Sequence, residues 1–349
     1  MDGDQAVDAG PISVQDGAQY QVQAQADRAA TPLRVLALDG GGIRGYSEII
    51  IVEQLMQRVK QELNLETLPK PCDYFDLICG TSTGGIVAIL LGRLRMSVKE
   101  VKDVYKVLCK KIFSKPKHHA SEGKFSAVNL EELMKATIVN LFSFVCTRAA
   151  QAASGVTVRK FRTYDTGDVG QEEDLRIWQA GRATSAAPTF FKRMRIGLVD
   201  FLDGGVGFNN PAQTLLDEMH ELYGDRPIAC IISVGAGVAT IKSYSEPKGW
   251  QKLIPKELIE LFAEMVTDCE KTAHELEVKF NHAPQVYYRF SVQRGLESIG
   301  MEEWKKLGEV EAKTVEYLQH DKIKNEVRAA AKALSAPVAS GLKASDLRN

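Results

Sequence analysis

The chain of 349 residues lacks a strong charge of either sign, a long apolar run and a recognisable export signal. Its formal net charge of −1 argues against a partner held by bulk electrostatics, so we expect no nucleic-acid partner. The longest nearly uncharged apolar stretch, IACIISVGAGVA, is too short to span a bilayer, and no basic segment followed by an apolar core opens the chain. These absences predict a cytoplasmic protein, for which peripheral contact with membranes stays open.

CxxC pairs are also absent. The six cysteines stand singly, and several lie inside apolar runs such as FDLICG and PIACIISV. This usage is typical of buried thiols in a reducing compartment. The remaining composition, with 44% hydrophobic and 26% charged residues, is that of a globular chain long enough for one large domain.

The first 31 residues lack any apolar period and are rich in Gln, Ala, Asp and Gly, so we expect a disordered tail over 1–31. One domain is expected over 32–335, with a helical segment from about 302, and a linker or tail over 336–349. The order of strand, glycine turn and helix occurs twice, at PLRVLALDGGG and at YFDLICG followed by TSTGGIVAILLGRL.

Later segments continue this alternation. RIGLVDFLDGG predicts a hairpin, PIACIISVGAG and QVYYRFSV predict strands, and DLRIWQAGRATSAAP predicts a helix that Pro188 stops. The segment IVNLFSFVC is interpreted as a cap element. The alternation of strand and helix indicates an α/β sandwich.

GTSTG at 80–84 places Ser82 in a sharp turn between a buried strand and a buried helix. Such a turn needs neighbours without bulky side chains, which Gly80 and Gly84 provide. The following helix would aim its amino-terminal amides at the place where an oxyanion develops, so Ser82 is a candidate nucleophile. The motif is short, and glycines that only help a helix pack against a sheet would give the same pattern.

DGGGIRG at 39–45 places three consecutive glycines between a strand and a helix, which leaves backbone amides free to converge on an anion. A phosphate cradle is disfavoured because the GxGxxG spacing is not met and no Walker lysine follows. An oxyanion hole is favoured because the serine turn follows at the distance of a parallel crossover. The guanidinium of Arg44 suits either a substrate phosphate or a salt bridge that holds the loop.

No histidine follows a strand in a glycine turn, and His282, before a predicted strand, is the best of six poor candidates for a base. Asp203 instead ends an apolar run and opens a glycine turn, the same placement that exposes Ser82. An unperturbed Asp is about 2.6 pK units less basic than His, roughly 3.5 kcal/mol. A Ser82–Asp203 pair would therefore need burial to raise the pKa of Asp203, or a strong oxyanion hole.

DGGGIRG, GTSTG and DGG, in this order, resemble the motifs of the patatin-like phospholipase family, and GRATSAAPTFF and SVGAG extend the likeness over about residues 33–300. Within this family, the sequence most resembles the patatin domains of fungi. The resemblance implies a three-layer α/β/α sandwich with a mostly parallel central sheet. It also implies a Ser–Asp dyad and hydrolysis of phospholipid or other acyl-lipid esters, with neither a metal nor another cofactor.

Carried over by position, Ser82 is the nucleophile and Asp203 the base. The amides of Gly41, Gly42 and Ile43 would form the oxyanion hole. Arg44 would stand near the substrate head group. Fungal patatin domains often head longer chains, so the resemblance also allows further domains in a longer native protein.

Some expectations concern the lipid itself. Acyl chains would contact apolar side chains, with Phe142, Phe144, Phe190 and Phe191 as candidates, although core packing explains at least half of them. The lysine-rich stretch 106–124 could dock on anionic lipid, but it also reads as a solvated loop. Three alternatives stay open: a Ser-His-Asp esterase that uses His282, a catalytically silent lipid-binding or signalling domain, and a nucleotide-binding switch.

Overall fold

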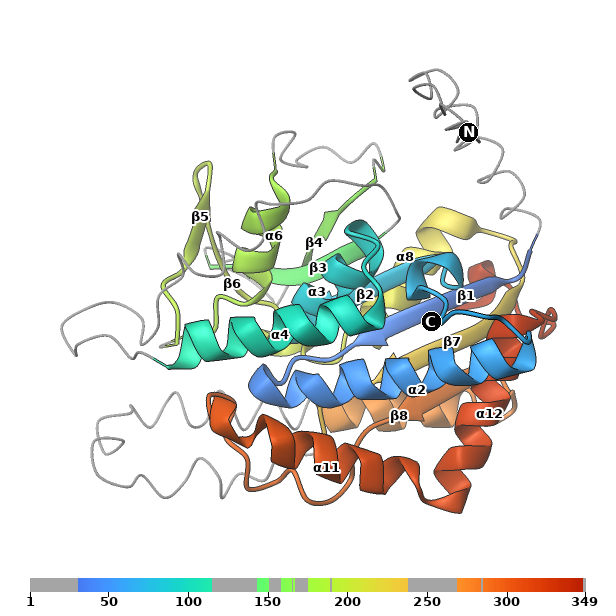
Figure 1. Ribbon diagram of the computed structural model, residues 1–349. Coiled ribbons are helices and arrows are strands. Elements are labelled where there is room, and N and C mark those ends of the chain that lie inside the picture. Colours follow the sequence, from blue (N-terminus) through green and yellow to red (C-terminus); the bar gives the residue numbers. More distant parts are fainter. Residues whose placement is uncertain are drawn as a thin grey trace, which may run out of the picture.

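The computed structural model describes residues 31–114, 143–150, 158–164, 166, 175–188, 190–237, 269–283 and 285–347. These residues form one eight-stranded mixed sheet with helices on both faces (Figure 1). The strands are β1 (Leu33–Leu38), β2 (Leu77–Thr81), β3 (Ser143–Ala149), β4 (Val158–Arg162), β5 (Met194–Ile196), β6 (Val199–Asp203), β7 (Ile228–Val234) and β8 (Tyr287–Phe290).

The described strands follow the order β5-β6-β3-β2-β1-β7-β8, and β4 pairs with β3 off this path. Pairing is parallel from β3 through β2, β1 and β7 to β8. Pairing is antiparallel where β3 meets β4 and β6, and within the β5–β6 hairpin. The inner strands β1, β2 and β7 are apolar over most of their length, because helices bury both of their faces.

Helices connect the strands and supply the outer layers. They are α2 (Tyr46–Glu62), α3 (Ser82–Ala88), α4 (Val98–Phe113), α6 (Ile177–Thr184), α7 (Gly205–Phe208), α8 (Ala212–Tyr223), an unlabelled helix over 269–279, α11 (Leu307–Leu318) and α12 (Asp321–Ser335). Shorter turns are η1 (Gly42–Gly45), η2 (Pro71–Asp73), the π-helical η3 (Ile89–Arg93), η5 (Trp304–Lys306) and η6 (Ala344–Leu347).

Each face of the sheet has its own core. On one face α2, α3, α4, α11 and α12 pack over side chains such as Leu36 and Ile78. On the other face α8, the helix over 269–279 and η6 cover side chains such as Val35 and Phe144. In α2, Val52 and Val59 are fully buried at helical spacing. The predicted three-layer α/β/α sandwich with a mostly parallel sheet is confirmed.

The pairing around β3 sets the position of the site. Thr81 of β2 pairs with Cys146, and the next residue of β3, Thr147, pairs with Asp203 of β6. Since β4 occupies the opposite edge of β3 over the same residues, β2 and β6 follow one another along a single edge. The residues that end β2 and β6 therefore meet beside β3.

Three segments differ from the expectation or complete it. The cap element expected at IVNLFSFVC is wrong for residues 143–146, which form the first part of β3 inside the sheet. The helix α6 ends at Thr184, before Pro188 is reached. Residues 340–347, within the expected linker or tail, pack onto the domain, where Ile228 N donates to Leu342 O and Leu347 is 2% exposed. Residues 1–30 lie outside the described part of the chain.

Candidate active site

Ser82 lies at the junction of β2 and α3 in a backbone conformation that L-residues rarely adopt, with φ of 54°. Gly80 and Gly84 make this turn sterically feasible. A Cβ on Gly80 would collide with the backbone of Gly84, and a Cβ on Gly84 would collide with the carbonyl oxygens of Leu38 and Asp39 at the end of β1. The turn therefore has the geometry of a nucleophile elbow, in which strain exposes the serine hydroxyl.

The hydroxyl of Ser82 donates to Asp203 Oδ2 over 2.7 Å. The second carboxylate oxygen, Oδ1, accepts from the Gly205 N–H over 2.7 Å, which fixes the plane of the carboxylate. Asp203 is fully buried, whereas Ser82 is partly exposed. Ser82, which directly follows β2, and Asp203, which ends β6, are thus in contact although 121 positions separate them.

Burial raises the pKa of Asp203 from 3.8 to about 7, and the hydrogen bonds from Ser82 and Gly205 oppose this rise in part. A carboxyl group with a pKa near 7 has the basicity of an ordinary histidine. The deficit that the sequence poses for an aspartate base is therefore offset by desolvation at this position.

The end of α6 links the two residues, and residue patterns give no direct signal of this. Thr184 Oγ1 accepts from the Ser82 N–H over 3.0 Å and donates to Cys146 O over 2.6 Å. The backbone of the same turn accepts from the other side, since Asp203 N donates to Ala186 O and Gly204 N to Thr184 O. The motif GRATSAAP thus holds both the serine turn and the aspartate turn.

The glycine loop lies beside Ser82, because a Cβ on Gly40 would be 3.1 Å from Ser82 Cβ. Two of the three amides predicted for an oxyanion hole donate within the chain: Gly41 N to Thr83 Oγ1 over 3.1 Å, and Ile43 N to Met301 O over 2.9 Å. The Gly42 N–H has no hydrogen-bond acceptor among the described residues. Met301 lies directly over this loop.

Arg44 is 3% exposed, and its Nε donates to Gly41 O over 3.4 Å. Its guanidinium is thus held inside the loop. At the start of the loop, Asp39 forms a buried ion pair of 2.6 Å with Arg289 of β8 and also accepts from the Cys269 thiol over 2.9 Å. These contacts fix the end of β1, from which the glycine loop departs.

The other predicted residues are the histidine base of the alternative esterase and the apolar side chains expected near an acyl chain. His282 is exposed and leads into the amino end of β8, whereas Ser82 lies at the carboxyl ends of the parallel strands. Phe144 is 1% exposed in the core under α8, and Phe191 is 8% exposed against the guanidinium of Arg182. Phe142 lies outside the described residues.

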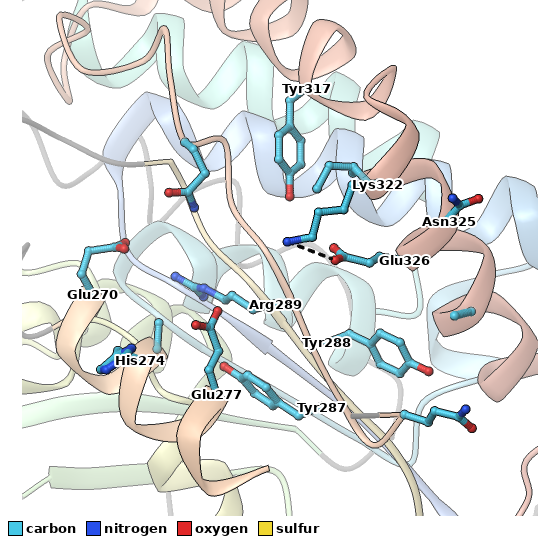
Figure 2. Close-up of a pocket in the computed structure, with 15 residues that line it drawn as sticks. Glu270, His274, Glu277, Tyr287, Tyr288, Arg289, Tyr317, Lys322, Asn325 and Glu326 are labelled. Carbon is cyan, nitrogen blue, oxygen red and sulfur yellow. Dashed lines mark ion pairs between the residues drawn. The ribbon is translucent and has the colours of Figure 1, made fainter. Parts of the chain in front are cut away.

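A separate pocket of about 730 Å³ lies between β8, the helix over 269–279, α11 and α12 (Figure 2). Glu270, Glu277, Tyr317 and Lys322 line it, and neither Ser82 nor Asp203 does. Arg289 contributes to its wall and reaches Asp39 from there. Among the described residues, no three His, Cys, Asp or Glu side chains gather as a metal site requires. In the same residues, no helix combines the length and the apolar character that crossing a membrane demands.

Comparison with known proteins places the sequence in a family. A family model described as patatin-like phospholipase matches residues 36–216. Calcium-independent phospholipase A2-gamma of Oryctolagus cuniculus is 29% identical over 228 residues, which cover 59% of this chain and 28% of that protein. Phospholipase A I of Arabidopsis thaliana is 23% identical over 332 residues, covering 74% of this chain and 24% of that protein.

The chain therefore spans less than a third of the length of these relatives. Among solved structures, VipD from Legionella pneumophila is similar with a TM-score of 0.37 and 13% identity, over 83% of this chain and 67% of that chain. The family match covers the glycine loop, Ser82 and Asp203 together. The chain belongs to the patatin-like phospholipase family.

Proposed function

We propose that this chain is a lipid acyl hydrolase of the phospholipase A type, with Ser82 as nucleophile and Asp203 as base. The observation that carries the proposal is the 2.7 Å hydrogen bond from the Ser82 hydroxyl to a buried Asp203 whose pKa is raised to about 7. A base with this pKa is suited to accept a proton near neutral pH. The relatives named calcium-independent phospholipase A2 support a lipid ester as the substrate.

In the proposed acylation step, Ser82 Oγ attacks the ester carbonyl carbon while its proton passes to Asp203 Oδ2. The electron pair of the carbonyl bond moves to the carbonyl oxygen. When the tetrahedral intermediate collapses, the bond to the lipid alcohol breaks and the alcohol takes the proton from Asp203. The products of this half-reaction are the acyl-enzyme and a lysolipid.

In the second half-reaction, water gives a proton to Asp203 and attacks the acyl carbon. The bond to Ser82 Oγ then breaks, and Ser82 recovers its proton from Asp203. The fatty acid leaves, and the ionised carboxylate is restored for the next cycle. One carboxyl group thus acts as base and acid in turn, which a pKa near the working pH favours.

The oxyanion would be held by the glycine loop at Gly41, Gly42 and Ile43, aided by the amino end of α3. Gly42 is ready to donate, because its N–H has no acceptor among the described residues. The amides of Gly41 and Ile43 would have to exchange Thr83 and the Met301 carbonyl for the substrate oxygen. A role for Arg44 at the head group would likewise require its guanidinium to leave its buried position.

Two observations weigh against the esterase that uses His282. This histidine is exposed near the amino end of β8, whereas Ser82 lies at the carboxyl ends of the parallel strands. The carboxylate already contacts the serine directly, so there is no gap for an imidazole between them. His282→Ala should therefore leave hydrolysis unchanged.

The test measures fatty-acid release from phospholipid vesicles with a calcium chelator present, for the parent, Ser82→Ala and Asp203→Asn. We expect release by the parent and a loss of at least about a hundredfold in both variants. Fatty-acid release that persists in Ser82→Ala would overturn the assignment of Ser82 as the nucleophile. No release by the parent from phospholipid, lysophospholipid or acylglycerol would favour a catalytically silent lipid-binding domain.

A further inference from the structure

The β5–β6 hairpin projects beyond the carboxyl ends of the parallel strands, where Ser82 lies. β3 continues past the end of β2, and β6 runs back along that extension so that Asp203 is its innermost residue. Leu198, in the turn at the outer end of β6, stands five residues before Asp203. At about 3.3 Å per residue, it lies roughly 16 Å along the strand from Asp203.

The tip of this hairpin carries an exposed apolar side chain. Gly197 and Leu198 form the two-residue loop between β5 and β6, and Gly197 has φ of 57°, as the first position of a type II′ turn requires. Leu198 follows it and is 87% exposed, the most exposed large hydrophobic residue of the described chain. A single exposed leucine is common, so its surroundings decide its meaning.

Those surroundings are basic. Lys192, Arg193 and Arg195 are all exposed, on or next to β5. The strand alternates, so that Arg193 and Arg195 share the outer face while Ile196 is buried in the core. Asp200, across the ladder from Arg195, is the one acidic residue from 192 to 202.

We propose that the β5–β6 hairpin, residues 192–199, docks the protein on an anionic lipid bilayer. This proposal rests on the proposed function, because a hydrolase of bilayer lipids must bring Ser82 to the membrane surface. The cations of the hairpin complement anionic head groups, and Leu198 at the projecting tip inserts among the acyl chains. Because the hairpin lies beyond the carboxyl ends of the parallel strands, docking through it turns the candidate active site toward the bilayer.

Cations on an edge strand also prevent sheets from joining edge to edge, and β5 is the edge strand here. That role accounts for Arg193 and Arg195 but gives no reason for an exposed leucine at the tip. The two roles differ in their consequence, since only docking predicts that the hairpin residues change affinity for vesicles.

The test measures binding to sedimented vesicles in the Ser82→Ala background, so that no lipid is hydrolysed. Vesicles of equal parts phosphatidylcholine and phosphatidylserine are compared with phosphatidylcholine alone. The charge variant is Arg193→Gln/Arg195→Gln. Its control, Arg328→Gln/Lys332→Gln, removes the same charge from exposed positions of α12, at the other end of the molecule (Figure 1).

Each cation at an anionic surface strengthens binding about fivefold, or about 1 kcal/mol at 1.4 kcal/mol per tenfold. We therefore expect the hairpin double variant to bind phosphatidylserine vesicles about 25-fold more weakly, with little change in the control. Leu198→Ser should weaken binding to both vesicle types about tenfold, and high salt should not restore or mimic this loss.

Equal binding by the parent, the hairpin variant and Leu198→Ser would overturn the proposal, as would equal weakening by the α12 control. In the background with Ser82 intact, the hairpin variants should hydrolyse a soluble short-chain ester at the parent rate. Vesicle binding that depends on the hairpin, in a protein without any hydrolysis, would uphold this surface and reject the proposed function instead.

Discussion

Burial changes what a carboxyl group can do at Asp203. Full desolvation raises its pKa to about 7, and the hydrogen bonds from Ser82 and Gly205 limit the rise. In the proposed mechanism the ionised form is the base, so the protonated form is inactive. The same burial that makes the group basic must also cost stability, because the ionised carboxylate is held away from water.

The first prediction concerns the pH dependence of hydrolysis. Since Asp203 must be ionised in the free enzyme, kcat/KM should rise through about pH 7 and fall about tenfold per pH unit below it. Initial rates on a soluble ester between about pH 5 and about pH 9 give this profile. His282→Ala is the control and should keep the same midpoint; loss of the midpoint in that variant would point to a histidine base.

The second prediction concerns stability. The pKa of Asp203 is about 7 in the folded state and 3.8 for an unperturbed carboxyl group. The folded protein therefore binds more protons than the unfolded chain between about pH 4 and pH 7. Its contribution to the free energy of unfolding is therefore greatest at low pH and falls as the pH rises through this window. At pH 8 the neutral Asn of Asp203→Asn avoids up to about 4 kcal/mol of this cost.

Urea unfolding of the inactive Asp203→Asn variant should thus show higher stability than the parent at about pH 8. The difference should shrink as the pH approaches 4. A variant that is less stable than the parent at both pH values would contradict the assigned cost of burial. A stability gain with loss of activity is the expected trade-off at an active site.

The carboxyl-terminal turn of α6 joins elements that are far apart in the sequence. It accepts from Ser82 through a side chain and from Asp203 and Gly204 through backbone carbonyls. The expected stop at Pro188 places the helix end too late, because carbonyls in the residues before the proline bond to the end of β6 and its turn. Tertiary hydrogen bonds therefore decide where this helix ends.

The third prediction tests this turn. Thr184→Val keeps the shape of the side chain but removes the acceptor for Ser82 N and the donor to Cys146 O. We expect a loss of about 2 kcal/mol in the free energy of unfolding, at about 1 kcal/mol per hydrogen bond. We also expect kcat to fall by about ten- to a hundredfold, because the nucleophile is displaced.

Thr184→Ser keeps the hydroxyl and should restore most of both losses. Steady-state kinetics and urea unfolding separate the two effects, since a positioning role lowers kcat with little change in KM. If Thr184→Val lost stability but kept the parent kcat, the residue would be structural only.

Strands bounded by glycine turns were predictable at this scale, and β3 was not. Apolar runs that end in glycine identify β1, β2 and β7, because a strand buried on both faces needs such a run. The segment that contains β3 has no comparable turn at its end, and its pairing with three strands depends on residues far along the chain. Local pattern alone therefore gave no reason to place it in the sheet.

Across the whole molecule, one ion pair joins the start of the glycine loop to β8. Asp39 directly follows β1, and Arg289 belongs to β8, 250 positions later; both side chains are at least nine-tenths buried. Nothing in the sequence marks Arg289 as the partner of Asp39. The fold brings them together across β7.

The fourth prediction follows from this burial. Asp39→Asn leaves the guanidinium of Arg289 without its charge partner, so we expect a loss of about 3–5 kcal/mol in urea unfolding. The double variant Asp39→Asn/Arg289→Gln should lose less than the sum of the two single variants. Removing the exposed Lys99–Asp103 pair through Lys99→Gln should change stability by less than about 1 kcal/mol. Additive losses would contradict a buried, coupled pair.

The two residues proposed to react could be predicted from the sequence, but the residues that support them could not. Ser82 and Asp203 each follow an apolar run and lie in a glycine turn, and the structure brings their side chains together. The contacts of Thr184, Asn209 and Met301 with the serine turn and glycine loop carry no local signal, since each arises from a segment that reaches the site only after folding.

The central claim is that Ser82 is a nucleophile activated by Asp203, and covalent labelling tests it most directly. A fluorophosphonate probe is added to the parent and to Asp203→Asn, and the site and rate of modification are followed by mass spectrometry. We predict a single adduct on Ser82, formed at least about a hundredfold more slowly in Asp203→Asn. An adduct on another residue, or equal rates in the two proteins, would contradict the account.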